Sequence, residues 1–345
     1  MTIKNYQKKF LQSYQLRSEV TGKYIARCDG EAVYLYNADD YQELACFRDL
    51  NYVNQIKFSD DGRILVLKSI EPELAVYDIS EMKLICHIKV ENTSQAQDGK
   101  FCLAPDNQYI YNIVYFNDLS SAIARIDVKK QSYQIIFHFE NCLFEEAEYL
   151  SHRDIYLFSG KDRTVNKYFV LEYGVKGDKF RRVTLNREYR FFFSLSAIEA
   201  FVAVAANKIY ILAADYITPL RVFTPIDDKT TKLNFFNIIT ESPALHKIFH
   251  KNEEEYARLK IDTERNMLDV PVEGDIVALA FSYNMKYLLV ATNNVLKIYD
   301  YQKLRLLQQI KLYNIADINF GFDDKTVLVG TWNYGYIYNL IDLVK

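Results

Sequence analysis

The sequence has little of what marks linkers, disordered tails or nucleic-acid-binding surfaces. It contains only 11 Gly and 6 Pro in 345 residues, so no segment has the composition of a flexible interdomain linker. Basic and acidic side chains nearly balance, with a formal net charge of −3. This balance excludes a general attraction to nucleic acid or to anionic membranes. The length alone accommodates two domains or one large β or α/β domain.

Cysteine is also scarce, and its spacing argues against disulfides. The five cysteines are odd in number and form no C-x-x-C pair. Each lies beside apolar residues in a strand-like segment, which predicts buried, reduced thiols and a cytoplasmic protein. The cysteines are Cys28, Cys46, Cys86, Cys102 and Cys142.

Long apolar runs are missing as well. The first 12 residues, MTIKNYQKKFLQ, lack the apolar core of a secretion signal. The longest apolar stretch, residues 200–217, is divided by Asn207 and Lys208. A hairpin of two short strands is predicted there in place of a membrane span. We therefore expect no association with a membrane.

Tyrosine and phenylalanine, in contrast, are abundant. The chain has 28 Tyr and 22 Phe but a single Trp. These side chains suit pleated, half-buried surfaces, so the composition favours β structure.

A pattern of four short strands and tight turns repeats along the chain. In residues 53–90 the apolar segments VNQIKF, RILVLKS, LAVYDIS and KLICHIKV are separated by polar turns such as SDDG and IEPE. The same order recurs near the C-terminus, in FSYNMKYLLVATNNVLKIYDYQ at 281–302. Four strands joined by hairpins form one blade of a β-propeller.

The repeat covers the whole chain at an interval of roughly 40 to 46 residues. A four-stranded sheet cannot shield both of its faces, so each blade needs two neighbours and the array must close. The sequence therefore predicts an all-β fold in which residues 1–345 form a single closed β-propeller of four-stranded antiparallel blades. First strands are expected near residues 13, 53, 99, 145, 190, 232, 275 and 315.

These starts favour eight blades, with seven blades and an insertion as the alternative. The sixth unit is the irregular one, because Ser242-Pro243 and the following ALHKIFHKNEEEYARL also fit a capped helix. The last unit, 315–345, supplies only three strands. Residues 1–11 are predicted to complete it and so to close the ring.

These repeats resemble the WD-repeat β-propellers, whose third strand ends in Trp-Asp after a Phe-Ser-Pro-Asp-Gly-type turn. No Gly-His dipeptide opens a blade here, so the buried His–Asp network of that family is not expected. The Trp-Asp place is held by Tyr77-Asp78 and Tyr299-Asp300, and more weakly by Ile126-Asp127 and Ile341-Asp342.

The resemblance implies a face on which partners dock. In that family it is built from the loops between the fourth strand and the next first strand, and between the second and third strands. Trp332 and Tyr334 are the predicted anchors, because aromatic side chains dominate binding hot spots. The alternative is that Trp332 plugs the join between the last and first blades. Carried onto this sequence, the face holds Arg48, Tyr52, Glu71, Asn117, Arg163, Tyr189, Asn207, Asn293, Trp332 and Tyr334.

The sequence offers no strong catalytic or metal-binding motif. His246 and His250, with Glu253 nearby, have a spacing that zinc accepts on a helix, but the surrounding charge run indicates surface histidines. We find no Gly-x-Ser-x-Gly elbow, phosphate-binding loop or calcium loop. We therefore predict no cofactor, no metal and no enzymatic activity.

One segment, residues 161–190, is locally basic. Basic side chains interleaved with Tyr and Phe are able to bind nucleic acid or an acidic partner. Lys and Arg on edge strands also serve to block sheet-to-sheet aggregation. The basic side chains are Lys161, Arg163, Lys167, Lys176, Lys179, Arg181, Arg182, Arg187 and Arg190.

The predicted function is a non-enzymatic interaction scaffold that presents a rigid loop face to a protein partner. The first alternative is an enzyme or small-ligand-binding propeller with its site in the central channel. The second is binding of nucleic acid or an acidic partner through the basic edge at 161–190. A metal or converging carboxylates and histidines at the channel mouth would favour an enzyme, whereas an aromatic, mixed-charge rim would favour a scaffold.

Overall fold

The computed structural model describes residues 6–344 except 95, 119, 177–178, 190, 196–198, 206–207, 226–229, 235–266 and 272–274. The chain divides into two compact units, one of Met1–Pro225 with Ile276–Lys345 and one of Ile226–Asp275. The first unit carries seven antiparallel β-sheets, which we number as blades 1 to 7 in chain order.

The first three blades each have four strands in sequence order. Blade 1 consists of β2 (Gln15–Ser18), β3 (Tyr24–Cys28), β4 (Val33–Asn37) and β5 (Glu43–Phe47). Blade 2 consists of β6 (Val53–Phe58), β7 (Ile64–Ser69), β8 (Glu73–Asp78) and β9 (Lys83–Lys89). Blade 3 consists of β10 (Phe101–Leu103), β11 (Tyr109–Tyr115), β12 (Ser121–Asp127) and β13 (Ser132–Phe139).

The next three blades repeat this arrangement. Blade 4 consists of β14 (Cys142–Leu150), β15 (Ile155–Asp162), β16 (Lys167–Gly174) and β17 (Lys179–Thr184). Blade 5 consists of β18 (Phe191–Leu195), β19 (Ala200–Ala205), β20 (Lys208–Leu212) and β21 (Pro219–Phe223). Blade 6 consists of β24 (Ile276–Phe281), β25 (Tyr287–Thr292), β26 (Val295–Asp300) and β27 (Arg305–Lys311).

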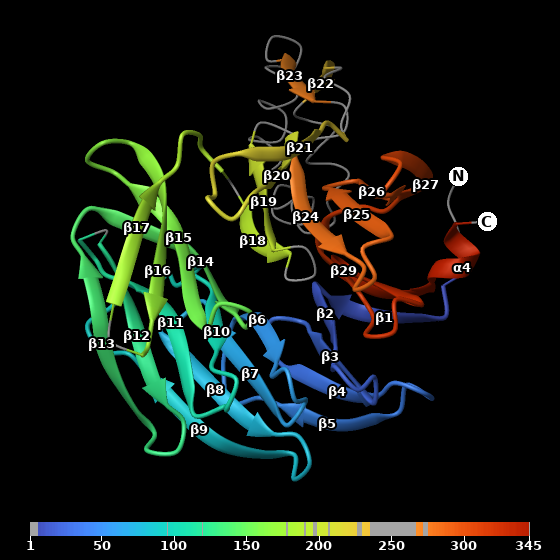
Figure 1. Ribbon diagram of the computed structural model, residues 1–345. Helices are drawn as coiled ribbons and strands as arrows, with labels where there is room; N and C mark the ends of the chain where they lie inside the picture. Colours follow the sequence, from blue (N-terminus) through green and yellow to red (C-terminus); the bar gives the residue numbers. More distant parts are fainter. Residues whose placement is uncertain are drawn as a thin grey trace, which may run out of the picture. The chain divides into compact units, whose positions relative to one another are not determined.

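Blade 7 combines both ends of the chain. It consists of β28 (Ile315–Phe320), the long β29 (Thr326–Asn339) and the N-terminal β1 (Lys8–Ser13). The first half of β29 pairs with β28, and its second half pairs with β1. Figure 1 shows the blue β1 beside the red β29. The helix α4 (Leu340–Leu343) follows, with Asn339 as its N-cap, so Ile341-Asp342 lies in a helix and not at the end of a third strand.

The core lies between the blades, and this explains the uninterrupted apolar runs. All six residues of β7, ILVLKS, are buried. Leu65 and Leu67 pack with residues of blade 1, whereas Val66 packs with residues of blade 3. Because successive side chains on a strand point to opposite faces, a strand with a neighbouring blade on each side needs apolar residues at successive positions, as in Ile64–Leu67. The buried Lys68 and Ser69 that follow donate to main-chain carbonyls.

The turns use short polar side chains as caps. In the SDDG turn of blade 2, the main-chain N–H of Ile64 donates to Ser59 Oγ, and Ser59 Oγ donates to Asp61. Gly62 has φ +70°, a left-handed conformation that favours glycine. Asp61 also accepts a 2.8 Å hydrogen bond from Asn107 in the corresponding turn of blade 3, so the turns join neighbouring blades.

The blades of the first unit close into a ring of seven, and the favoured prediction of eight was wrong. Blade 5 contacts blade 6 directly, through the rings of Phe193 and Phe281 and through a hydrogen bond from Arg221 to the Tyr301 carbonyl. Blade 7 packs on blade 1 through a shared apolar cluster. No eighth sheet fits between blades already in contact. The prediction of an all-β propeller of four-stranded antiparallel blades was correct. The blade count is that of the predicted alternative, seven blades and an insertion.

The unit assigned to the extra blade was misread because its length equals that of a true blade. In the second unit, β22 (Thr230–Asn234) pairs antiparallel with β23 (Met267–Pro271). The helix considered for 242–259 lies outside the described residues. The second unit, Ile226–Asp275, is therefore an insertion in the chain between blades 5 and 6.

Candidate functional site

Two kinds of connection meet at one end of the blades, which we call the loop face. The N–H of Val53, at the start of blade 2, donates to the Gly30 carbonyl between β3 and β4. The N–H of Ile70, between β7 and β8, donates to the Tyr52 carbonyl between β5 and β6. The N–H of Trp332 likewise donates to the Asn314 carbonyl, 3.1 Å away. Fourth-to-first and second-to-third connections thus form one surface.

The structure places most of the predicted face residues in these connections. Glu71 and Tyr334 are half-buried, and Asn207 lies outside the described residues. Tyr189 was a wrong choice as a contact residue, because it is 3 % exposed and packs against Tyr210. The exposed residues are Arg48, Tyr52, Asn117, Arg163, Asn293 and Trp332.

Trp332 does not plug the join between the last and first blades. Its side chain is 75 % exposed. The join is filled instead by Phe10 and Ile337, which pack with Leu16 of blade 1. The sole tryptophan of the chain is therefore accessible on the loop face.

Trp332 is part of a larger exposed apolar group. Leu11 is 71 % exposed and pairs in register with Tyr334. Tyr313, 66 % exposed, precedes the residue whose carbonyl accepts from Trp332. Neither Leu11 nor Tyr313 was among the predicted face residues. Tyr313 lies in a fourth-to-first connection, one of the two kinds of connection from which the face residues were predicted. Leu11 joins the group only because β1 pairs with β29.

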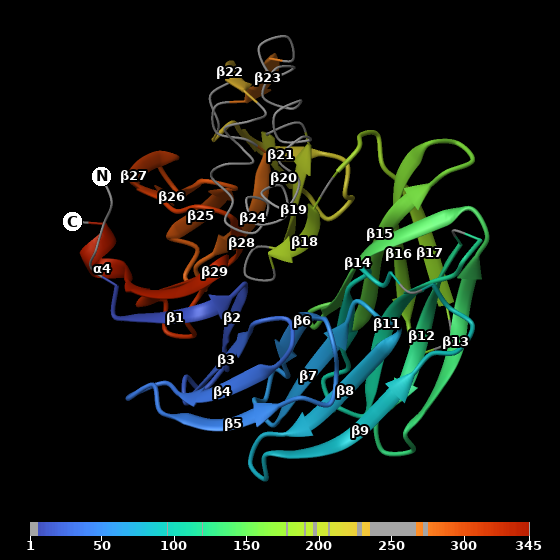
Figure 2. The same ribbon diagram turned by 180° about the vertical axis from the view of Figure 1, so that it is seen from behind.

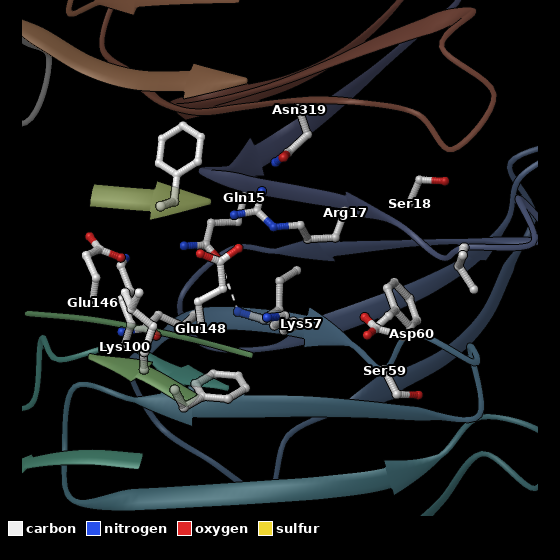
Figure 3. Close-up of a pocket in the computed structure, with 18 of the residues that line it drawn as sticks. Gln15, Arg17, Ser18, Lys57, Ser59, Asp60, Lys100, Glu146, Glu148 and Asn319 are labelled. Carbon is white, nitrogen blue, oxygen red and sulfur yellow. Dashed lines mark hydrogen bonds between the residues drawn. The ribbon is translucent and has the colours of Figure 1, made fainter. Parts of the chain in front are cut away.

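The first strands of the blades line a central cavity of about 600 Å³. Its charged lining is mixed, as Figure 3 shows. Amide, hydroxyl and apolar side chains complete it, and among the residues that line it none is histidine. The charged residues are Arg17, Lys57, Asp60, Lys100, Glu146 and Glu148.

Several charges in the cavity are already bound. Arg17 pairs with Asp317 of blade 7. Glu148 accepts hydrogen bonds of 2.6 Å from both the N–H and the Oγ of Ser194 on blade 5. Burial raises the pKa of Glu146 to about 7, and nearby Lys100 opposes that rise. These bonds connect blade 1 to blade 7 and blade 4 to blade 5 around the cavity.

We expect Glu146→Gln to remove part of the pH dependence of stability. The pKa of this carboxyl rises from 4.5 to about 7 on folding, so the folded state binds more protons than the unfolded state between these values. Stability therefore falls as pH rises through this window. After discounting for solvent in the cavity, the variant should be more stable than the parent by about 1–2 kcal/mol at pH 8. Urea unfolding at pH 5 and pH 8 measures this difference, and parallel pH profiles would contradict it.

The described residues do not assemble a metal site. Among them, no cluster of three or more His, Cys, Asp or Glu side chains could hold a metal ion. Ser59, one of the hydroxyls of the cavity, is engaged by its own turn. The candidate zinc ligands His246, His250 and Glu253 lie outside the described residues.

Four of the eight described basic side chains in the segment 161–190 lie near carboxylates. Arg182 pairs with Asp162 at 2.6 Å, and Lys176 pairs with Asp154 at 2.7 Å. Arg181 and Lys161 lie within 4 Å of Glu172 and Glu188, respectively. Arg190 lies outside the described residues. The carboxylates of the same blade thus offset much of the positive field that nucleic-acid binding requires.

No described helix is long and apolar enough to cross a bilayer. The apolar stretch at 200–217 forms the antiparallel pair β19 and β20, with Ala205 opposite Lys208, as predicted. Four of the five thiols are buried, whereas Cys46 is exposed.

Comparison with known proteins supports the fold. No protein-family model matches the chain, and no curated protein matches it. Among solved structures, the crystal structure of the Cps50 (Swd1) β-propeller domain of Myceliophteria thermophila is similar with a TM-score of 0.67. The match covers 98 % of this chain and 99 % of that chain at 10 % identity. The chain therefore has the fold of the WD-repeat-like β-propellers.

Proposed function

We propose that this protein is a non-enzymatic interaction scaffold that binds a protein partner on the loop face. The observation that carries the proposal is the exposed group of Trp332, Tyr313 and Leu11, with Tyr334 beside it. Exposed aromatic clusters on rigid frames mark interaction sites, and aromatic anchors supply most of the binding energy of protein interfaces. A cytoplasmic location is part of the proposal and is supported by five free thiols.

The two alternatives have weaker support. The lining of the central cavity combines paired charges with a carboxylate held by Ser194, which suits bracing between blades more than catalysis. The basic edge of blade 4 carries its own carboxylate partners. The mixed-charge rim and the exposed aromatic side chains together favour the scaffold.

We expect Trp332→Ala to abolish most partner capture while leaving the fold intact. Removing a central aromatic anchor typically costs 2 kcal/mol or more, so captured partner should fall at least tenfold. The matched control is Tyr283→Ala, because Tyr283 is 66 % exposed in the β24–β25 turn at the other end of the blades. Quantitative affinity capture from native extract, with all three proteins at equal loading, measures the change. Equal capture by parent and Trp332→Ala would refute the proposal.

A further inference from the structure

The exposed apolar group has cations beside it where the chain ends meet. We call Lys9, Leu11, Tyr313, Trp332 and Tyr334 the closure patch. Lys9 pairs with Tyr336 and Leu11 with Tyr334 in the β1–β29 register. Directly paired residues and residues two apart share one face of a sheet. Lys9, Leu11 and Tyr334 therefore lie on one side of blade 7. Figures 1 and 2 both show β1 alongside β29.

The ammonium group of Lys9 lies over aromatic rings. Its Nζ is 3.6 Å from the centre of the Tyr334 ring and 5.7 Å from that of Tyr336. Tyr334 is held in turn by Thr331, whose Oγ1 accepts from its N–H and donates to its carbonyl. A cation that rests on rings fixed in this way keeps its outward side available to an anion.

A second cation, Arg48 of blade 1, is connected to the end of β1 through two intervening side chains. The Arg48 guanidinium donates to the Tyr34 hydroxyl at 3.3 Å. Arg27 stacks on the same ring at 3.9 Å and donates to the main-chain carbonyls of Leu11 and Gln12. These contacts link Arg48, through Tyr34 and Arg27, to the end of β1.

These two cations differ from Lys176, Arg181 and Arg182 of blade 4, which lie within 4 Å of carboxylates. Among the described residues, Lys9 and Arg48 form no ion pair, and both contact aromatic rings instead. Two carboxylates in the adjoining connections of blade 1 are occupied. Asp29 caps Ala32 and lies 3.8 Å from Arg27, and Asp49 accepts from the Tyr77 hydroxyl. The surface thus offers exposed apolar area together with two cations that form no ion pair among the described residues.

We infer, on the basis of the proposed function, that the closure patch binds an acidic peptide segment that also carries an apolar anchor residue. Carboxylates of the segment pair with Lys9 and Arg48, where the neighbouring rings reduce hydration and strengthen the attraction. The apolar anchor contacts Trp332, Leu11 and Tyr334. Such a site selects acidic segments by charge and holds them by aromatic burial.

Selection of a phage-displayed library of random 12-residue peptides on the full-length protein tests the inference. We expect enriched peptides that combine Asp or Glu with Phe, Leu or Trp. Binding of one such labelled synthetic peptide should weaken at least tenfold in Trp332→Ala. It should weaken about three- to tenfold in the double variant Lys9→Gln/Arg48→Gln, and also as salt rises. The matched control is Lys167→Gln/Lys179→Gln, which removes two exposed blade 4 cations and should bind as the parent does.

The outcomes separate the inference from the proposed function. Peptides that need Trp332 but carry no acidic residue, or that bind the Lys9/Arg48 double variant normally, overturn the inference and leave the scaffold proposal standing. Selection that yields no peptide, or only peptides independent of Trp332, also overturns it, while affinity capture still tests the scaffold. If a single-stranded oligonucleotide binds tightly in a manner that depends on Lys9 and Arg48, and no peptide binds, the ligand of the closure patch is nucleic acid and not an acidic peptide.

Discussion

Deletion of residues 1–11 is expected to lower the melting temperature of the protein by about 5 °C or more. The deletion removes most of β1, whose residues Lys8 to Leu11 pair with β29. It also removes Phe10, which is 6 % exposed and packs against Tyr36 with ring centres 4.8 Å apart. Loss of one buried phenylalanine side chain alone costs about 3–5 kcal/mol. The deletion also leaves the edge of β29 unpaired, which favours aggregation.

Differential scanning calorimetry of the parent and three variants tests this prediction. Residues 1–5 precede β1 in the chain. Their deletion alone should leave the melting temperature within about 1 °C of that of the parent. Phe10→Ala should account for a large part of the full effect, because it keeps the main-chain pairing and removes only the side chain. An unchanged melting temperature after deletion of 1–11 would show that the N-terminal segment does not close the ring.

Gly330→Ala is expected to destabilise the protein by about 3 kcal/mol, near the upper end for overpacking. Gly330 lies in β29, where the main chain of blade 7 passes that of blade 1. A methyl group at this position would fall on the carbonyl of Tyr14 and 3.0 Å from the main-chain nitrogen of Gln15. Main-chain atoms at the start of a blade cannot rotate away as a flexible side chain can. The two blades must therefore separate.

Gly174→Ala is the matched control, because it also replaces a strand glycine. There the nearest atoms to a new methyl group are 3.9 Å away, which is ordinary van der Waals contact. Its stability in urea unfolding should stay within about 1 kcal/mol of the parent or increase slightly. Equal effects of the two substitutions would show that the approach of blade 7 to blade 1 is looser than the structure has it.

The loop face illustrates how far residue patterns reach. A rule based on connection type selected Trp332 and Tyr52, both of which are exposed, because turn residues between apolar runs mark the connections. The same rule selected Tyr189, which packs inward against Tyr210. Connection type specifies where a residue lies along the chain, but burial depends on how the connection folds back on its own blade.

The pairing that brings Leu11 into the closure patch could not be read from any local pattern. Leu11 and Tyr334 are 323 positions apart and meet only through strand pairing. The same holds for Arg27, whose guanidinium reaches the carbonyls of Leu11 and Gln12. Contacts of this kind depend on which ends of the chain share a sheet.

The sequence by itself determined the repeating sheet module and its closure into a propeller. Each apolar run must be buried on both sides, and only neighbouring modules can do that. The tertiary structure alone decided the number of blades, since a segment of ordinary repeat length between blades 5 and 6 did not become a blade. Repeat length is a property of the chain, whereas the size of a ring depends on which sheet faces meet.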